Sequence, residues 1–270
     1  ERFVQIPDNF PDRSPVADAD GIVSVKAAPQ GGNYVQVGDK EHYVPQHLAV
    51  TVHNGDRVEA GQQLSEGIVR PDDIVRYRGI GEGRRYYADR LKQMLDEGGT
   101  GADRRNTEVV ARGAIDHVQV EDPDDLPDGA LPDDMVSYQR ALRSFTPPED
   151  SQELNPKNAL GLYLQKPALH FTPGTRITPR VADKLAATGF NKVLTHAKAP
   201  SFTPRMQRLQ TQAFANDDWL ASMHTSYLGR QLAQGVTRGQ ETDVERNIHF
   251  APRLAFGEGF GKDIETTGHF

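Results

Sequence analysis

Residues 43–80 read YVPQHLAVTVHNGDRVEAGQQLSEGIVRPDDIVRYRGI, and this stretch decides the fold. Leu48, Val50 and Val52 alternate with their neighbours, which predicts a half-buried strand. Asn54-Gly55 then supplies the pair typical of a tight hairpin turn, where glycine tolerates a positive φ. A second glycine turn follows a few residues later. Short strands with a glycine at each reversal predict a small closed sheet whose backbone bends sharply.

The same stretch resembles a known module. Residues 52–64, V-x-x-G-D-R-V-E-A-G-Q-x-L, are similar to the sandwich-barrel hybrid that biotinyl/lipoyl-type carriers share with the β′ subunit of multisubunit RNA polymerases. A carrier needs a modifiable lysine at its exposed hairpin, and none lies between Lys40 and Lys92. We therefore favour the β′ subunit.

The sequence that follows the glycine turns supports this choice. EGIVRPDDIVRYRGI, at residues 66–80, resembles the C-terminal region of β′, where a D-x-L-x-E-G turn precedes a helix. Helical patterns at 84–95 and 104–120 resemble the next helices of that subunit. The resemblance thus covers residues 43–120, and a second part covers residues 173–196, where a short helix followed by a strand is expected. In β′ we would expect this second part to come first.

The chain departs from β′ at the catalytic loop. The N-A-D-F-D-G-D motif, whose aspartates hold catalytic magnesium in that subunit, has no counterpart in the 270 residues. The resemblance therefore implies an architecture without the catalysis. We expect a protein that is not an enzyme, with no catalytic residue, no cofactor and no metal site.

The expected fold class is α+β. It comprises a small β barrel-sandwich-hybrid module with short helices, a mixed helical C-terminal part and extended arms. The predicted division is an extended arm at 1–20, a β-rich sandwich-barrel-hybrid-like domain with helices at 21–120, an acidic, proline-rich linker with a short helix at 121–158, a small α/β-helical domain at 159–234 and a glycine-rich extended arm at 235–270.

Two kinds of binding residue stand out. A basic run interleaved with tyrosines is the candidate for contacting a polyanion, since arginine grips phosphate and aromatic rings stack on bases; its members are Arg76, Arg78, Arg84, Arg85 and Arg90. A solvated helix face with local ion pairs is the alternative. Aromatic residues are the candidates for partner binding, namely Trp219 and Tyr227 on a helix predicted at 217–233, and Phe256 and Phe260 in the glycine-rich arm. Packing in a core is the alternative for the aromatic face of that helix.

Other chemical motifs fail on spacing. Gly79-x-Gly81-x-Gly83 looks like a dinucleotide loop, but its last glycine is one residue early and no βαβ unit surrounds it. The acidic stretch at 121–134 lacks the glycine position of a calcium loop and contains prolines, so it is interpreted as a solvated linker. There is no cysteine, which excludes disulfides and thiolate metal sites.

Composition favours a component of a larger assembly. Only 36% of the residues are hydrophobic, and 25 glycines and 18 prolines add long extended stretches. The net charge of −7 argues against a general polyanion binder, although a local basic patch is compatible with it. No apolar run is long enough to span a membrane. The chain begins Glu-Arg-Phe without methionine, so we expect a processed end or a piece of a longer polypeptide.

Three functional hypotheses follow. The first is a non-catalytic structural or interaction protein that binds other subunits, such as a proteolytically processed phage virion component associated with a head or portal; it would reside in the virion or the host cytoplasm. The second is a nucleic-acid-binding fragment or accessory of a DNA-dependent RNA polymerase that uses the arginine run. The third is a hydrolase whose site is assembled from distant residues.

Overall fold

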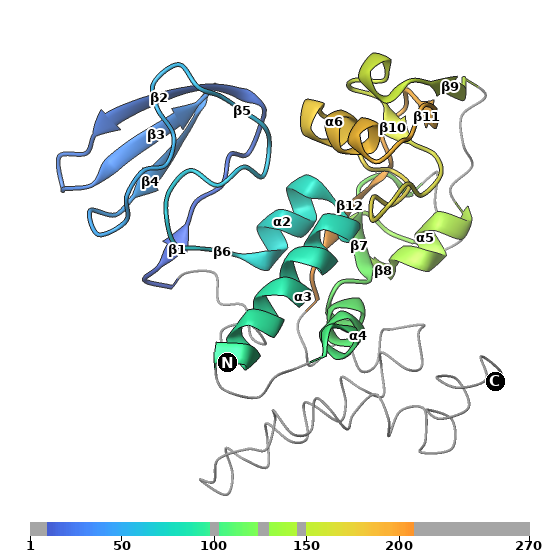
Figure 1. The fold of residues 1–270 in the computed structure, drawn as a ribbon, viewed down its shortest axis with the longest axis horizontal. Coiled ribbons are helices and arrows are strands. Elements are labelled where there is room, and N and C mark those ends of the chain that lie inside the picture. The colour runs from blue at the N-terminus through green and yellow to red at the C-terminus, as the bar shows by residue number, and fades with distance from the viewer. Residues whose placement is uncertain (1–9, 98–102, 124–129, 145–149, 208–270) are drawn as a thin grey trace, which may run out of the picture. The chain divides into compact units, whose positions relative to one another are not determined.

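The computed structural model describes residues 10–97, 103–123, 130–144 and 150–207 (Figure 1). Short helices and several small sheets make up these residues, which confirms the predicted α+β class. The chain divides into two compact units, each described by itself below. Unit 1 comprises residues 1–5, 84–145 and 201–270, and unit 2 comprises residues 6–83 and 146–200.

The first part of unit 2 is a β-rich module. Its main sheet is antiparallel throughout, with the strand order β4-β3-β2-β5, and a separate parallel pair joins β1 to β6. The strands are β1 Arg13–Ser14, β2 Gly21–Ala27, β3 Asn33–Val37, β4 Lys40–Val44, β5 Arg57–Val58 and β6 Ile68–Val69.

The predicted Asn-Gly turn is present. Gly55 has φ +90°, and the Asp56 carboxylate accepts a hydrogen bond of 2.8 Å from the backbone N–H of His53. The Asn54 side chain accepts another, of 2.5 Å, from the backbone N–H of Val25. The turn is therefore fixed both internally and against β2, which places β5 in register beside that strand.

The prediction of a regular strand through Leu48, Val50 and Val52 is wrong. Its pairing is limited to an isolated bridge between Val50 and Ser65 and a few neighbouring backbone hydrogen bonds. Leu48 and Val52 are nevertheless buried, so the alternation correctly indicated burial. The apolar core of the module consists of Ala17, Val23, Val35, Val37, Val44, Leu48, Val52, Val58 and Leu64.

Residues that were expected to lie in an N-terminal arm enter this module. β1 pairs with β6, Val16 bridges to Gln63, and the Ala17 side chain lies in the core. Backbone hydrogen bonds from Ala17 to Gln62 and from Leu64 to Pro15 connect the same two segments. The module therefore begins before the first strand that hydrophobic alternation revealed.

Two consecutive helices follow the strands: α2 at Pro71–Arg78 and α3 at Ile80–Glu97. Gly79, with φ +88°, separates them. α3 begins four residues before its predicted start. The prediction missed its first turn because two of the residues there are glycines. At Gly83 an added Cβ would lie 2.3 Å from a methyl carbon of Val75, and at Gly81 it would meet the backbone of His170. Close packing here requires glycine despite its low helix propensity.

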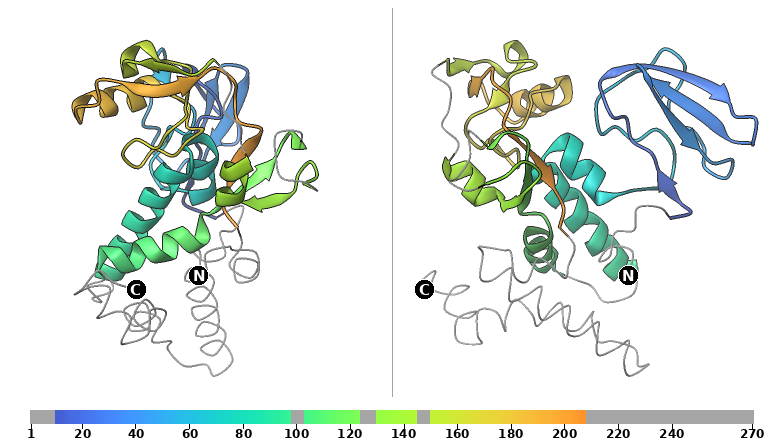
Figure 2. Two further views of the ribbon diagram at one scale, coloured as in Figure 1. Left: turned by 90° about the vertical axis from the view of Figure 1, so that its right-hand side faces the viewer. Right: turned by 180° about the vertical axis from the view of Figure 1, so that it is seen from behind.

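The second part of unit 2 is a small α/β arrangement. α6 packs on an antiparallel sheet of strand order β10-β11-β9 (Figure 2). Phe171, Ile177, Val181 and Leu185 supply much of the core between helix and sheet. As predicted, a short helix is followed by a strand. The elements are β9 Gln152–Leu154, the 3₁₀ helix η2 Pro156–Asn158, β10 Tyr163–Leu164, α6 Pro179–Ala187 and β11 Val193–His196.

Unit 1 contains most of α3, a second long helix and a three-stranded antiparallel sheet of order β12-β7-β8. Asp103 caps α4 by accepting from the backbone N–H of Arg105. Tyr138 packs edge-on against Phe202, with 6.4 Å between ring centroids. The further elements are α4 Arg104–Ala114, β7 His117–Val120, β8 Met135–Ser137, α5 Tyr138–Ser144 and β12 Phe202–Arg205.

Candidate functional site: a charged network around Glu82

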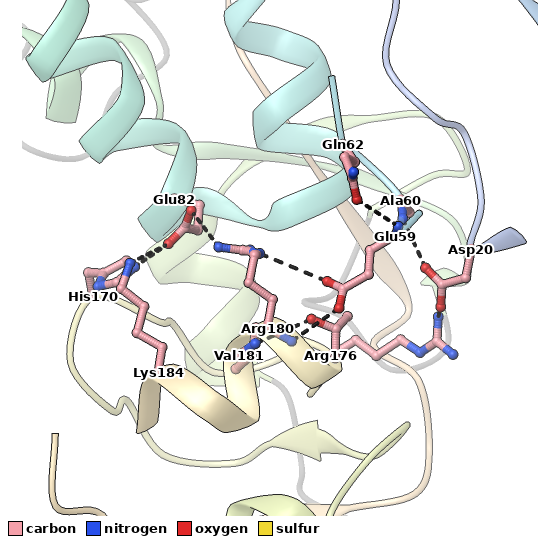
Figure 3. A network of polar contacts seen from close by, with 11 residues as sticks. Asp20, Glu59, Ala60, Gln62, Glu82, His170, Arg176, Arg180, Val181 and Lys184 are labelled. Carbon is pink, nitrogen blue, oxygen red and sulfur yellow. Dashed lines mark hydrogen bonds and ion pairs between the residues drawn. The ribbon is translucent and has the colours of Figure 1, made fainter. Parts of the chain in front are cut away.

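Glu82 is the centre of a network of polar contacts in unit 2 (Figure 3). It lies in the first turn of α3, and its side chain is only 11% exposed. One carboxylate oxygen contacts Nε2 of His170 and lies 3.6 Å from Nζ of Lys184. The other accepts a 3.1 Å hydrogen bond from the guanidinium of Arg180. One carboxylate thus faces three basic side chains.

A second carboxylate extends the network to the β-rich module. Glu59, which follows β5, accepts a 3.0 Å hydrogen bond from the backbone N–H of Arg180, and its side chain lies 3.9 Å from the same guanidinium. Thr178 caps α6, and Pro179 begins it, which leaves the Arg180 N–H unused within the helix. Glu59 therefore satisfies a free donor and also opposes the positive end of the helix dipole.

A third carboxylate completes the network. Asp20 accepts a 2.9 Å hydrogen bond from the backbone N–H of Ala60 and a 3.2 Å bond from the guanidinium of Arg176. Figure 3 shows these contacts next to those of Glu59 and Arg180. Asp20 and Glu59 of the β-rich module thus contact Arg176 and Arg180 of the α/β part, and Glu82 of α3 contacts Arg180 as well.

The electrostatics of Glu82 favour its ionised form. Burial alone would raise the pKa of this carboxyl, but the hydrogen bond from His170 and the positive charges of Arg180, His170 and Lys184 outweigh burial and hold the pKa below its usual range. Because the folded state favours the carboxylate, the network stabilises the fold at neutral pH.

Arg78 lies near the network, and its surroundings act in opposite directions on the pKa of its guanidinium. Burial lowers the pKa of its guanidinium, the nearby Arg180 lowers it further, and Glu82 and Glu59 act in the other direction. Gly61 leaves room for this side chain, since an added Cβ there would lie 2.9 Å from a methylene carbon of Arg78. Arg78 and Arg180 thus lie close enough for their charges to interact with each other and with Glu82 and Glu59.

Each carboxylate of the network is bonded to a basic side chain or to backbone N–H groups, as a partly buried carboxylate requires. Among the described residues no group of three or more histidines and acidic side chains is placed to hold a metal ion. The network instead joins segments that lie about a hundred residues apart in sequence, as the pairs Glu82–His170 and Glu59–Arg180 show.

The structure places the predicted arginines in different surroundings. Arg84 is half-buried and donates to the Ile115 carbonyl at 2.7 Å and to Asp116 at 2.5 Å. Arg85 is exposed and lies 3.9 Å from Asp89. Arg84 thus fastens α3 to the segment after α4, while Arg85 stays at the surface.

The remaining arginines also differ. Arg76 is exposed beside the Tyr77 ring, with 5.3 Å from its guanidinium carbon to the ring centroid. Arg90 is exposed over the ring of Tyr86 at 5.6 Å. Arg78 lies near the network, as described above. Arg76 and Arg90 are therefore exposed and lie beside aromatic rings, as the predicted polyanion contact requires.

Sequence reasoning missed the network centred on Glu82. Local sequence gave a weak signal, because Glu82 sits between glycines that suggested a loop. Its partners His170 and Arg180 come from a distant segment and carry no motif. The predicted partner-binding residues Trp219, Tyr227, Phe256 and Phe260 lie outside the described residues. In the part of the chain that is described, no helix is both long and apolar enough to cross a membrane.

The fold and the site define a class of protein in which a glycine-bent β module is followed by two helices. Comparison with known proteins identifies relatives of the chain. No family model matches the chain. It is 32% identical over 114 residues to the β′ subunit of DNA-directed RNA polymerase from Thermodesulfovibrio yellowstonii, which covers 41% of this chain and 8% of that subunit.

Other relatives agree. The β′ subunit of Chloroflexus aggregans is 32% identical over 98 residues, or 36% of this chain and 6% of that subunit. That of Deinococcus radiodurans is 30% identical over 117 residues, or 41% of this chain and 8% of that subunit. The chain therefore contains a β′-like region, which confirms the predicted partial resemblance. The matched segment covers less than a tenth of the length of each of these relatives.

Proposed function

We propose that this chain is a non-catalytic structural segment of an RNA polymerase-type assembly, in which it packs against other subunits. The observation that carries the proposal is the likeness of about two-fifths of the chain to β′ subunits. Those relatives are subunits of DNA-directed RNA polymerases, so the same kind of assembly is the natural setting for this chain. Within it the chain would position other parts without taking part in the chemistry.

The Glu82 network supports a structural role. Its carboxylates are occupied by arginine, lysine, histidine and backbone donors, and it joins the β-rich module to the α/β part of unit 2. Networks of this kind fix the relative position of the segments that they join. A rigid arrangement of two small cores suits a scaffold more than it suits an enzyme that must open and close.

The sequence also suggested a processed virion component. The relatives above give that setting no support, so the polymerase-type assembly is the one we propose. A virion location would need an independent observation, such as the presence of the chain in purified particles.

Isolation of the assembly tests the proposal. A tag on the full chain, expressed in its native source, allows the intact complex to be purified and its polypeptides to be identified by mass spectrometry. We expect further polymerase-type subunits in fixed ratio to this chain. Recovery of the chain by itself, or with virion proteins and no polymerase-type subunit, would overturn the proposal.

A second candidate function is contact with nucleic acid through the predicted arginines. The observation that favours it is the exposure of Arg76 and Arg90 beside tyrosine rings. Filter binding of the full chain at low and high salt tests it, because phosphate contacts weaken as salt rises. Binding that is absent, or that does not respond to salt, would refute this function.

A further inference from the structure

The outer face of the β4-β3-β2 sheet carries two neighbouring tyrosines. Tyr34 on β3 and Tyr43 on β4 are register partners, so their side chains project from the same face. Their ring centroids lie 5.6 Å apart with an interplanar angle of 57°. Tyr43, on the edge strand β4, is 41% exposed. The pair therefore presents aromatic surface to solvent.

A lysine extends this pair across the third strand. Lys26 on β2 is the register partner of Tyr34, so the three side chains form one row across three strands. Lys26 is exposed and makes no ion pair within the described residues. We name this row, Lys26, Tyr34 and Tyr43, the Lys-Tyr-Tyr row.

The tyrosines of the row are held in place before any ligand arrives. The Tyr43 hydroxyl donates a 2.9 Å hydrogen bond to the Gly31 carbonyl, and the Gln30 side-chain amide donates one of 2.6 Å to the Tyr34 hydroxyl. Both bonds anchor the hydroxyl ends at the turn between β2 and β3. The rings therefore lose little freedom when a ligand stacks on them, which favours binding.

The surroundings of the row are polar and carry more positive than negative charge. The adjacent row contains Ser24, Gln36 and Glu41, which offer hydrogen bonds and one acid. Beyond it, Arg57 is exposed as the register partner of Ile22 and forms no ion pair among the residues described. Two unpaired cations against one carboxylate complement an anionic ligand, even though the chain as a whole carries −7.

We propose that the Lys-Tyr-Tyr row is a binding site for single-stranded nucleic acid, whose bases stack on Tyr34 and Tyr43 while Lys26 contacts the phosphate backbone. Aromatic side chains on an open sheet face stack on unpaired bases, and a flanking cation follows the backbone. A protein partner would instead favour an apolar face, and Ile22 is the one exposed aliphatic side chain on it within the described residues. The site shares no residue with the arginines of the second candidate function.

Fluorescence anisotropy with the full chain tests the site. The probes are a labelled oligo-dT and its RNA counterpart, with a duplex as the comparison, at about 50 mM and about 200 mM salt. We expect the single strands to bind and the duplex to bind much more weakly, because paired bases cannot stack on the rings. Failure of the single strands to bind at the lower salt would overturn the proposal and leave a protein as the occupant of the face.

Variants separate the row from other sites. Replacing both rings, in Tyr34→Ala with Tyr43→Ala, should weaken binding at least about tenfold, since each stacked base contributes substantially. The Tyr→Phe pair keeps the rings and should retain binding. Lys26→Gln should flatten the slope of log affinity against log salt by about 0.7. Unchanged affinity in the double alanine variant would refute the proposal.

Two controls complete the design. If the double alanine variant loses its circular dichroism spectrum, the single variant Tyr43→Ser replaces it, because an exposed side chain tolerates this change. Arg76→Gln with Arg90→Gln tests the arginines of the second candidate function. Binding that depends on those arginines and not on Tyr43 would assign the nucleic acid to the other surface and overturn the proposed site.

Discussion

Replacement of Gly81 by alanine tests the packing that the Glu82 network depends on. Gly81 lies in the first turn of α3, one residue before Glu82, and its Cα faces the backbone of His170. An added Cβ would stand 1.5 Å from the His170 carbonyl oxygen and 2.7 Å from its carbonyl carbon. The two segments would have to separate by roughly 1.5 Å before the contact became tolerable. That displacement would also pull His170 away from Glu82.

Two opposing effects decide the size of the change. In an unobstructed helix, glycine to alanine stabilises a protein by about 0.5–1 kcal/mol. Overpacking costs about 1–3 kcal/mol, and the upper end applies here because the obstacle is backbone, which cannot rotate away as a side chain can. We therefore expect Gly81→Ala to lower the free energy of unfolding by about 2 kcal/mol, which reverses the sign that helix propensity alone predicts.

Urea unfolding of the full chain, followed by far-ultraviolet circular dichroism, measures this difference. The matched control is Gly161→Ala, also in unit 2. Gly161 has φ +85° and no atom within 4 Å of an added Cβ, so it should lose only about 1 kcal/mol through backbone strain. If Gly81→Ala were neutral or stabilising at an unchanged denaturant slope, α3 would not approach the His170 backbone and the network would be misplaced.

Three further changes have definite expected outcomes. Glu82→Gln should cost about 2 kcal/mol at neutral pH because it weakens charged hydrogen bonds. Folding lowers the pKa of Glu82 from its usual value of 4.5, so its stabilisation is complete above that pH and is lost as pH falls through the folded pKa. The difference in unfolding free energy between wild type and variant should therefore narrow in acid, as urea melts across pH would show. Phe171→Ala should cost about 3–5 kcal/mol, since this side chain is 1% exposed in the α6 core, and a small loss in calorimetry would contradict that core. Thr178→Ala should cost about 1 kcal/mol by removing the cap of α6, whereas Thr178→Ser should be close to neutral, as thermal melts of both would test.

The sequence contained enough information for the local architecture. The Asn54-Gly55 turn was predictable because few residues accept a positive φ, and the alternation at Leu48 and Val52 correctly indicated burial. The absence of a regular strand there was not predictable. Alternation reports which side chains are buried, and it does not report whether the backbone pairs in a continuous ladder.

The start of α3 shows a different limit. Glycines at 79, 81 and 83 suggest a loop by propensity, yet only Gly79 has the positive φ that ends a helix. Gly81 and Gly83 lie within the helix, and both positions need glycine because neighbouring chain approaches too closely for a Cβ. Tertiary contact overrides propensity here, and a single sequence carries no record of the distant segment that makes the contact.

The candidate site was hidden for the same reason. Glu82 and its partner His170 are separated by 88 residues, and neither belongs to a spaced motif. The arginine run was visible because its members are close in sequence. The structure distinguishes among them only through partners that the sequence did not identify, such as Asp116 beside Arg84.

The most direct test of the central claim is DNA-directed RNA synthesis by the assembly isolated through a tag on this chain. The β′-like region predicts that the purified material incorporates nucleotides into RNA on a DNA template, and that removing the tagged chain from an extract removes that activity with it. Purified material that contains the chain in stable complex but synthesises no RNA, with the activity left in the depleted extract, would contradict the account.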